Sequence, residues 1–256
     1  MALSFQDAAG RIEFVLVSPS HPGNVGAAAR ALRVMGFRRL TLVAPRYPDM
    51  EQHPEALAFA SGAQDVLASC RVVGSLDEAL ANATLAVAIS AAGREFAPEA
   101  QLPEDAAERC RHELVADRKA AVALVFGTER TGLLIGEALR CQALCSIPGA
   151  ADYGSLNLAQ AVQVLAYTLR RALVDAPVAQ PKRSEGVAYA TNEQIRALFV
   201  HLESSLIEIG FLDPRHPKKL MPRLRRLFSR TRLEVAEVDL LRGVCTQIER
   251  YPERFR

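Results

Sequence analysis

Residues 121–173 read AVALVFGTERTGLLIGEALRCQALCSIPGAADYGSLNLAQAVQVLAYTLRRAL, and this stretch decides the predicted fold. The apolar run 121–126 is typical of a buried strand, and a polar turn with glycines at 127 and 132 follows it. A helical segment and a second short apolar run lead to Ile147-Pro148-Gly149, and a long amphipathic helix closes the stretch. Because ligands of open α/β sheets bind at the carboxyl ends of strands, these loops are predicted to form a binding site.

The residues before this stretch alternate between strand-like and helix-like segments. Strands are predicted at 11–18, 40–44, 72–73 and 85–89, and helices at 25–35, 54–69, 76–81 and 104–116, with a loop at 94–103. Alternation of this kind builds βαβ units. We therefore expect an α/β fold with a mostly parallel sheet that is covered by helices on both faces.

The composition is that of a globular chain in a reducing compartment. Half of the 256 residues are hydrophobic, which supplies a sizeable core and argues against wholesale disorder. The five cysteines are odd in number and scattered, so no disulfide framework is expected. The first ten residues do not resemble a signal peptide, and no apolar run reaches the roughly 20 residues of a membrane helix. We expect a cytoplasmic protein without a membrane partner.

Positive charge is concentrated in the last third of the sequence. Residues 1–171 carry a net charge of −2, whereas residues 172–256 carry a net charge of +4. A polar segment that contains Pro177, Pro181 and Gly186 separates the two parts. The sequence therefore predicts a domain over 1–174, a linker over 175–186, and an α-helical basic extension over 187–256 with helices at 192–210, 217–229 and 233–250.

The extension contains a basic run that predicts a polyanionic partner. Eight Lys or Arg residues and no acidic residue lie between positions 215 and 232. Neutralising phosphates with such a run gives strong affinity that does not depend on base sequence. The alternative is a solvated basic face with no partner. The residues predicted to bind RNA here are Lys218, Lys219, Arg223, Arg225, Arg226 and Arg230.

Several common sites do not match the sequence. Residues 23–26 (GNVG) join a strand to a helix, where a phosphate can bind a helix N-terminus, but they do not form a GxGxxG fingerprint. The second strand ends without the acidic residue that binds a ribose, so a nucleotide-binding oxidoreductase is disfavoured. Cys141 and Cys145 have no further metal ligands nearby, so no metal site is predicted.

Three motifs, in order and at plausible spacing, resemble the SPOUT methyltransferases. They are residues 24–30 after the first strand, residues 126–133 (FGTERTGL), and residues 147–149 (IPG) followed by residues 155–161 (SLNLAQA). The resemblance covers residues 11–174 and implies a trefoil knot, which the strand pattern alone does not suggest. It also implies a homodimer in which Arg30 of one subunit faces the cofactor of the other.

The resemblance implies S-adenosylmethionine as methyl donor, S-adenosylhomocysteine as product, and no metal. Arg30 matches the family's proposed catalytic residue, and Asn24 and Ser155 would orient Arg30 or the ribose. Because a guanidinium normally stays protonated, we favour a role for Arg30 in fixing the ribose and the adjacent phosphate, and a role as base stays open. Taken alone, Arg30 and Glu129 fit ordinary surface residues. The family's cofactor-binding residues map to Ile89, Ser90, Ala91, Gly127, Glu129, Ile147, Ser155, Leu156 and Asn157.

A narrower resemblance is to the tRNA ribose 2′-O-methyltransferases that act on cytidine or uridine at nucleotide 32 of the anticodon loop. It is carried by residues 90–91 (SA), 152–153 (DY), 216–217 (HP) and 224–228 (LRRLF). Two alternatives stay open. One is a SPOUT 2′-O-methyltransferase that acts on ribosomal RNA, and the other is a non-catalytic RNA-binding protein on the same fold. The second is disfavoured by the presence of Arg30, Glu129, Ser155 and Asn157.

Overall fold

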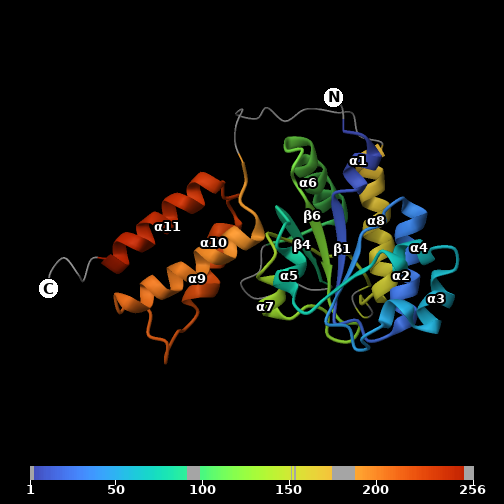
Figure 1. Ribbon diagram of the computed structural model, residues 1–256, viewed down its shortest axis with the longest axis horizontal. Helices are drawn as coiled ribbons and strands as arrows, with labels where there is room; N and C mark the ends of the chain where they lie inside the picture. The colour runs from blue at the N-terminus through green and yellow to red at the C-terminus, as the bar shows by residue number, and fades with distance from the viewer. Residues whose placement is uncertain (1–2, 91–98, 151, 153, 175–187, 251–256) are drawn as a thin grey trace.

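The computed structural model describes residues 3–90, 99–150, 152, 154–174 and 188–250. Within these residues the chain forms one sheet in the order β3-β2-β1-β6-β4-β7-β5, and neighbouring strands pair in parallel (Figure 1). The parallel α/β prediction is therefore confirmed. The strands are β1 (Ile12–Val17), β2 (Leu40–Val43), β3 (Arg71–Val73), β4 (Leu85–Ile89), β5 (Ala100–Gln101), β6 (Val122–Phe126) and β7 (Ala143–Cys145).

Helices pack on both faces of this sheet. In the first part of the chain they are α1 (Phe5–Ala9), α2 (Pro22–Met35), α3 (Pro54–Ala60), α4 (Gln64–Ala68), α5 (Leu76–Leu80), α6 (Pro103–Ala116), α7 (Ile135–Ala138) and α8 (Leu158–Val174), with a 3₁₀ turn at Met50–Gln52. The extension forms α9 (Asn192–Glu208), α10 (Leu220–Ser229) and α11 (Val235–Arg250). Figure 1 shows these three helices beside the sheet domain, on the side of α5 and α7.

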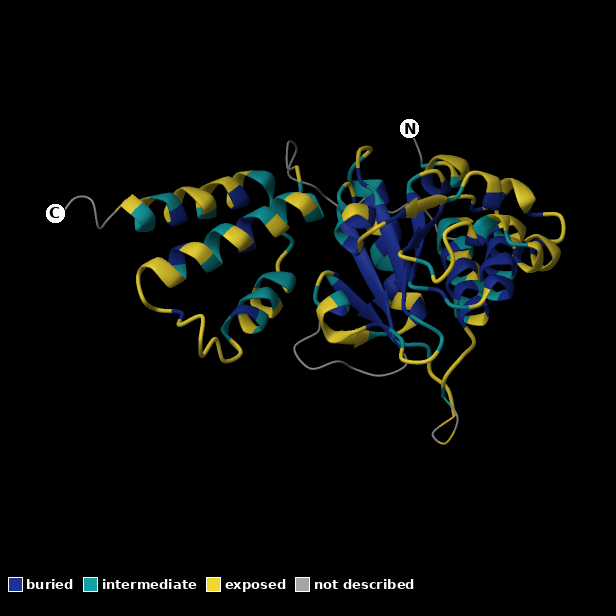
Figure 2. Cartoon of the chain, turned by 60° about the horizontal axis from the view of Figure 1, so that its bottom comes forward, coloured by how far each residue is buried: buried dark blue, intermediate teal, exposed yellow. Residues whose placement is uncertain are grey.

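Along each central strand, successive side chains point to opposite faces of the sheet, and this creates two hydrophobic cores. In β1, Phe14 and its neighbours at alternate positions face a core shared with α1, α2, α6 and α8. Val15 and Val17 face the opposite core, which is shared with α5 and α7. Both faces are covered, so the central strands are buried along their whole length, as Figure 2 shows. Phe14 also packs on Phe37 and Phe126, with ring centroids 5.4 and 6.2 Å apart.

Helix α2 lies directly against α3, and glycine permits the contact. A Cβ at Gly26 would lie 2.1 Å from the carbonyl oxygen of Ala56, so any larger residue would separate the two helices. Helix α2 also begins at Pro22, earlier than predicted, because proline fits the first turn of a helix. The segment 23–30 is therefore wholly helical, whereas the sequence predicts the helix only from residue 25.

Two further expectations from the sequence differ from the structure. The helix predicted over 54–69 is divided into α3 and α4, because Ser61 adopts a positive φ of 52° that a helix cannot accommodate. The predicted loop 94–103 contains β5, a short strand on the edge of the sheet beside β7. Residues 91–98, which include Ala91 and the first part of that loop, lie outside the described residues.

The helices predicted in the extension are present, with starts shifted by two or three residues in α10 and α11. They enclose two small hydrophobic clusters of their own, one around Leu198 and Leu233 and the other around Phe199 and Met221. The predicted linker at 175–186 lies outside the described residues. The trefoil knot stays a prediction from the resemblance, and the position of β6 between β1 and β4 is compatible with it.

Candidate active site

A cavity of about 260 Å³ opens at the carboxyl ends of β4, β6 and β7. Its walls come from three segments that are distant in sequence: the end of β4, the loop after β6, and the segment that leads into α8. This is the edge at which α/β sheets bind ligands. The cavity is lined by Ile89, Ser90, Phe126, Gly127, Thr128, Glu129, Arg130, Thr131, Gly132, Ile147, Gly154, Ser155, Leu156, Leu158 and Ala161.

The loop after β6 closes on itself. The backbones of Thr128 and Gly132 exchange two hydrogen bonds of 3.2 and 3.0 Å, and the hydroxyls of Thr128 and Thr131 lie 2.8 Å apart. This closure brings the backbone of Gly132 and Leu133 against Gly127. A Cβ at position 127 would lie 2.1 Å from Leu133 N, so only glycine allows the loop to take this shape.

Glu129 projects from this loop to the start of α2. Its carboxylate accepts hydrogen bonds from the backbone N–H of Ser20 (3.1 Å), the Ser20 hydroxyl (2.8 Å) and the backbone N–H of His21 (3.1 Å). It also accepts one from the side-chain amide of Asn24 at 3.1 Å. A carboxylate at this position satisfies donors at the N-terminus of a helix and interacts favourably with the helix dipole.

These contacts determine the charge state of Glu129. Partial burial by itself would raise the pKa of the carboxyl group, but the hydrogen bonds from Asn24 and Ser20 outweigh burial, and the pKa is lowered. Glu129 is therefore a charged carboxylate at neutral pH, with acceptor positions already engaged by Ser20, His21 and Asn24.

Asn24 links this loop to the third motif. While its amide nitrogen donates to Glu129, its side-chain oxygen accepts a hydrogen bond of 2.9 Å from Asn157 Nδ2. Asn157 also caps α8, because its side-chain oxygen accepts from the backbone N–H of Ala159 at 2.9 Å. A chain of side-chain hydrogen bonds therefore runs from the loop after β6, through α2, to the start of α8.

The structure brings together most of the residues predicted to bind the cofactor. Seven of them line the cavity: Ile89, Ser90, Gly127, Glu129, Ile147, Ser155 and Leu156. Asn157 does not line it, and reaches it through Asn24 and Glu129. Ala91 lies outside the described residues.

Ser20 and Leu158 were not predicted as parts of this site. Ser20 supplies two of the donors that hold Glu129, and Leu158 supplies part of the cavity wall. The available signal for Ser20 was its position just beyond the first strand, at the same sheet edge as the glycine loops. A single serine in a loop carries too little information to be selected on that basis.

Arg30 lies on α2, nearly two turns beyond Asn24, and its side chain is exposed. It does not line the cavity of its own chain. Ser155 therefore lines the cavity and Arg30 does not, while Asn24, on the same helix as Arg30, contacts Glu129 of the cavity wall.

The basic residues of the extension differ in their surroundings. Arg225 lines a cavity between the extension and the sheet domain, with its guanidinium 4.5 Å above the ring of Phe199, and burial followed by repulsion from Arg140 lowers its pKa. It is therefore the least available member of the set to an RNA phosphate. The exposed members are Lys218, Lys219, Arg223, Arg226 and Arg230.

In the part of the chain that the structure describes, no group of three or more His, Cys, Asp or Glu side chains is arranged to hold a metal ion. Cys141 and Cys145 are buried thiols, and burial raises the pKa of each to about 12. This disfavours the thiolate form that binds metals. No helix within the described ranges is long and apolar enough to cross a membrane.

Comparison with known proteins assigns the two parts of the chain. Residues 11–167 match the SpoU rRNA Methylase family, and residues 193–255 match the family described as tRNA methyltransferase TrmJ, C-terminal domain. The chain is 42% identical over 248 residues to the tRNA (cytidine/uridine/adenosine-2′-O-)-methyltransferase TrmJ of Pseudomonas aeruginosa, and the alignment covers 94% of each chain.

Solved structures agree with this assignment. TrmJ from Z. mobilis is 30% identical, with 93% of this chain and 98% of that chain covered and a TM-score of 0.78. A probable methyltransferase from Bordetella pertussis is 47% identical over 66% of this chain and 100% of its own length, with a TM-score of 0.64. The chain therefore belongs to the SpoU methylase family and, within it, to the TrmJ methyltransferases.

Proposed function

We propose that this protein transfers a methyl group from S-adenosylmethionine to the ribose 2′-hydroxyl of a cytidine or uridine at nucleotide 32 in the anticodon loop of tRNA. It does so as a cytoplasmic homodimer. The observation that carries the proposal is the cavity at the ends of β4, β6 and β7, whose walls come from the predicted cofactor-binding segments. The similarity to TrmJ of Pseudomonas aeruginosa supports tRNA as the substrate and the ribose as the methylated group.

The residues of the cavity fit the proposed methyl donor. Ile89, Ile147 and Leu156 provide apolar walls for an adenine ring, and the backbone around Gly127 provides polar groups at close range. A site of this kind holds a ring by apolar contact and orients it with a few hydrogen bonds. The donor's sulfonium supplies an activated methyl group when bound, and this chain's residues align the ribose hydroxyl with it.

Arg30 fixes the ribose and the adjacent phosphate in this proposal. A guanidinium is planar, remains charged and forms paired hydrogen bonds to phosphate, so it suits positioning better than proton removal. The hydroxyl proton then passes to phosphate or water. The alternative is that Arg30 itself acts as the base that removes this proton. Asn24 holds the first turn of α2 through Glu129 and Asn157, and thereby sets the direction of the helix that carries Arg30.

The exposed position of Arg30 supports a site completed by a second subunit. Because Arg30 is exposed and lies outside the cavity of its own chain, it is free to face the cofactor of a partner. Helices α2 and α8, which pack together, present exposed apolar side chains at Val34 (63%), Tyr167 (50%) and Val174 (53%). Such side chains suit a subunit interface on this face.

The extension supplies the affinity for tRNA. Its exposed basic residues on and around α10 are suited to phosphate contacts. The experiment that tests the proposed function is methyl transfer into unmodified tRNA, followed by nucleoside mapping, with ribosomal RNA as the competing substrate. Methylation at nucleotide 32 is expected. Methylation of ribosomal RNA alone would favour the alternative substrate, and S-adenosylhomocysteine binding without methyl transfer to either RNA would contradict the proposed activity.

A further inference from the structure

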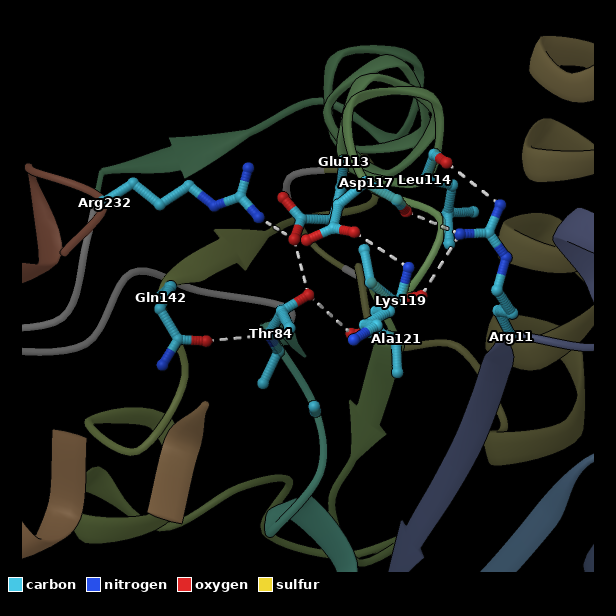
Figure 3. Close-up of polar contacts among 12 residues, drawn as sticks. Arg11, Thr84, Glu113, Leu114, Asp117, Lys119, Ala121, Gln142 and Arg232 are labelled. Atoms are coloured by element: carbon cyan, nitrogen blue, oxygen red, sulfur yellow. Dashed lines mark hydrogen bonds and ion pairs between the residues drawn. The ribbon is translucent and has the colours of Figure 1, made fainter. Parts of the chain in front are cut away.

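A buried acidic residue of the sheet domain pairs with an arginine of the extension. Glu113 lies on α6, is 2% exposed, and forms an ion pair with Arg232. The hydroxyl of Thr84, just before β4, donates a hydrogen bond of 2.5 Å to the same carboxylate. Figure 3 shows Arg232 reaching across from the extension toward Glu113 and Thr84. A buried charge is stable only when it is paired and hydrogen-bonded, so these groups depend on one another.

Both sides of this ion pair are held in place by their own domains. On the sheet-domain side, Arg11 donates to the carbonyl oxygens of Leu114 (2.9 Å) and Asp117 (2.8 Å), which fixes the C-terminal turn of α6 next to Glu113 (Figure 3). On the extension side, the guanidinium of Arg232 lies 3.8 Å above the ring of Tyr189. Burial, followed by repulsion from Arg109, lowers the pKa of Arg232 to about 10, which leaves it charged at neutral pH.

A second polar contact lies beside the first. The side chain of Gln142, just before β7, donates to Asn192 Oδ1 at 2.5 Å and accepts from the backbone N–H of Ala86 at 2.7 Å. Asn192, the first residue of α9, donates from both its backbone and its side chain to the carbonyl oxygen of Ala83 at 3.0 Å. The extension is therefore attached at the start of α9 and just beyond the end of α10.

The two attachments act across a cleft. A cavity of about 430 Å³ lies between the sheet domain and the extension, with Asp77 and Arg140 on one wall and Phe199 and Arg225 on the other. Apolar packing therefore does not close the whole boundary, and the polar contacts at Glu113 and Asn192 carry much of the orientation. Both contacts lie at the amino ends of the strands, because Thr84 precedes β4 and Gln142 precedes β7. The cofactor cavity lies at the opposite ends.

We propose that Glu113 and Arg232 are positioning residues that hold the basic helix α10 at a fixed orientation relative to the catalytic domain. Arg232 follows the C-cap of α10, Arg230, by two residues, so the ion pair anchors that end of the helix. Arg223, Arg226 and Arg230 are exposed on α10 and its cap. The ion pair thus determines where their charges meet the RNA. The role in methylation rests on the proposed function, whereas the role in domain orientation does not.

The test compares Glu113→Gln, Arg232→Met and the matched control Arg230→Met in the full-length protein. Small-angle X-ray scattering without RNA reads the domain arrangement, and circular dichroism checks that each variant is folded. We expect Glu113→Gln and Arg232→Met to increase the radius of gyration, and Arg230→Met to leave it unchanged. Asn192→Ala, which removes only the second contact, is expected to have a smaller effect of the same kind and provides a readout if Glu113→Gln fails to fold.

Kinetics with tRNA then separate positioning from phosphate binding. Arg232→Met is expected to raise KM for tRNA roughly tenfold, a size typical of directly coupled residues, and to leave the salt dependence of binding unchanged. Arg230→Met is expected to reduce that salt dependence. The double variant of Glu113→Gln and Arg232→Met should be no worse than either single variant. Scattering curves identical to the unmodified protein in all folded variants would overturn the proposal, whether or not tRNA is methylated.

Discussion

The carboxylate of Glu129 accepts a hydrogen bond from the side-chain amide of Asn24 at 3.1 Å, across 105 positions of sequence. The same asparagine accepts from Asn157 at 2.9 Å. These contacts join the loop after β6, the first turn of α2 and the start of α8. The cavity and the helix that carries Arg30 are therefore parts of one hydrogen-bonded unit, and a change at Glu129 should affect both.

Glu129→Gln should destabilise the protein by about 1–3 kcal/mol. The donors on Ser20, His21 and Asn24 now share the two oxygens of the carboxylate, whereas a glutamine amide offers them only one acceptor oxygen. The pH dependence follows from the lowered pKa. Stability contributed by the carboxylate is fully present above the pKa of an unfolded glutamate and is lost as pH falls through the lower pKa of the folded state. Urea unfolding of both proteins across this acidic range should show the difference shrinking with falling pH. A difference that stays constant would argue against the assigned charge state.

Gly127→Ala should abolish S-adenosylhomocysteine binding, since even a methyl group at this position would lie 2.1 Å from Leu133 N and would force the loop open. The matched control is Gly136→Ala, where the nearest atom is a flexible Arg140 nitrogen at 3.6 Å. Calorimetry should give no detectable binding for the first variant and affinity close to the unmodified protein for the second. Equal affinities would remove this loop from the cofactor site.

Arg30→Ala should lose most methyl transfer and keep its affinity for S-adenosylhomocysteine, because Arg30 lies outside the cavity. Arg30→Lys should restore little methyl transfer, since the point charge of an ammonium group does not replace a planar guanidinium with paired donors. Arg33→Ala is the control, one turn further along α2, where the arginine pairs with Asp65 at 3.0 Å. Its turnover should be near normal. Near-normal turnover in Arg30→Ala would mean that another residue positions the ribose.

Truncation near Lys182 should leave a folded domain that binds cofactor and binds tRNA far more weakly. In the full-length protein, Arg223→Ala and Arg226→Ala should each lower the logarithmic salt slope of tRNA binding by about 0.7–0.9. Arg38→Ala on the catalytic domain, where the arginine is also exposed but pairs with Asp65, is the control. Filter binding across a salt series provides the measurement. The same slope in all these proteins would show that α10 is a solvated basic face.

Local patterns of sequence were sufficient for much of this protein. Strand β6 is apolar at five successive positions, and that run predicts a strand buried on both faces. The glycine loop after it was predicted as part of a site, and in the structure it lines the cavity, because loops at strand ends share one edge of a parallel sheet. The basic run on α10 was also predicted from the sequence, because it depends only on which residues are present.

Only the tertiary structure decided the contacts between residues that are distant in sequence. The sequence predicts a helix only from residue 25, yet α2 begins at Pro22, where Glu129 accepts hydrogen bonds from the N-cap residue His21 and from the side chain of Asn24. Arg225 and Arg226 are equivalent in sequence, but Arg225 stacks on Phe199 and Arg226 is exposed. Hydrogen bonds, burial and ion pairs such as Glu113 with Arg232 arise from packing between elements. Charge and hydrophobicity along the chain specify which elements form, and the contacts between those elements determine which polar side chains remain free to act.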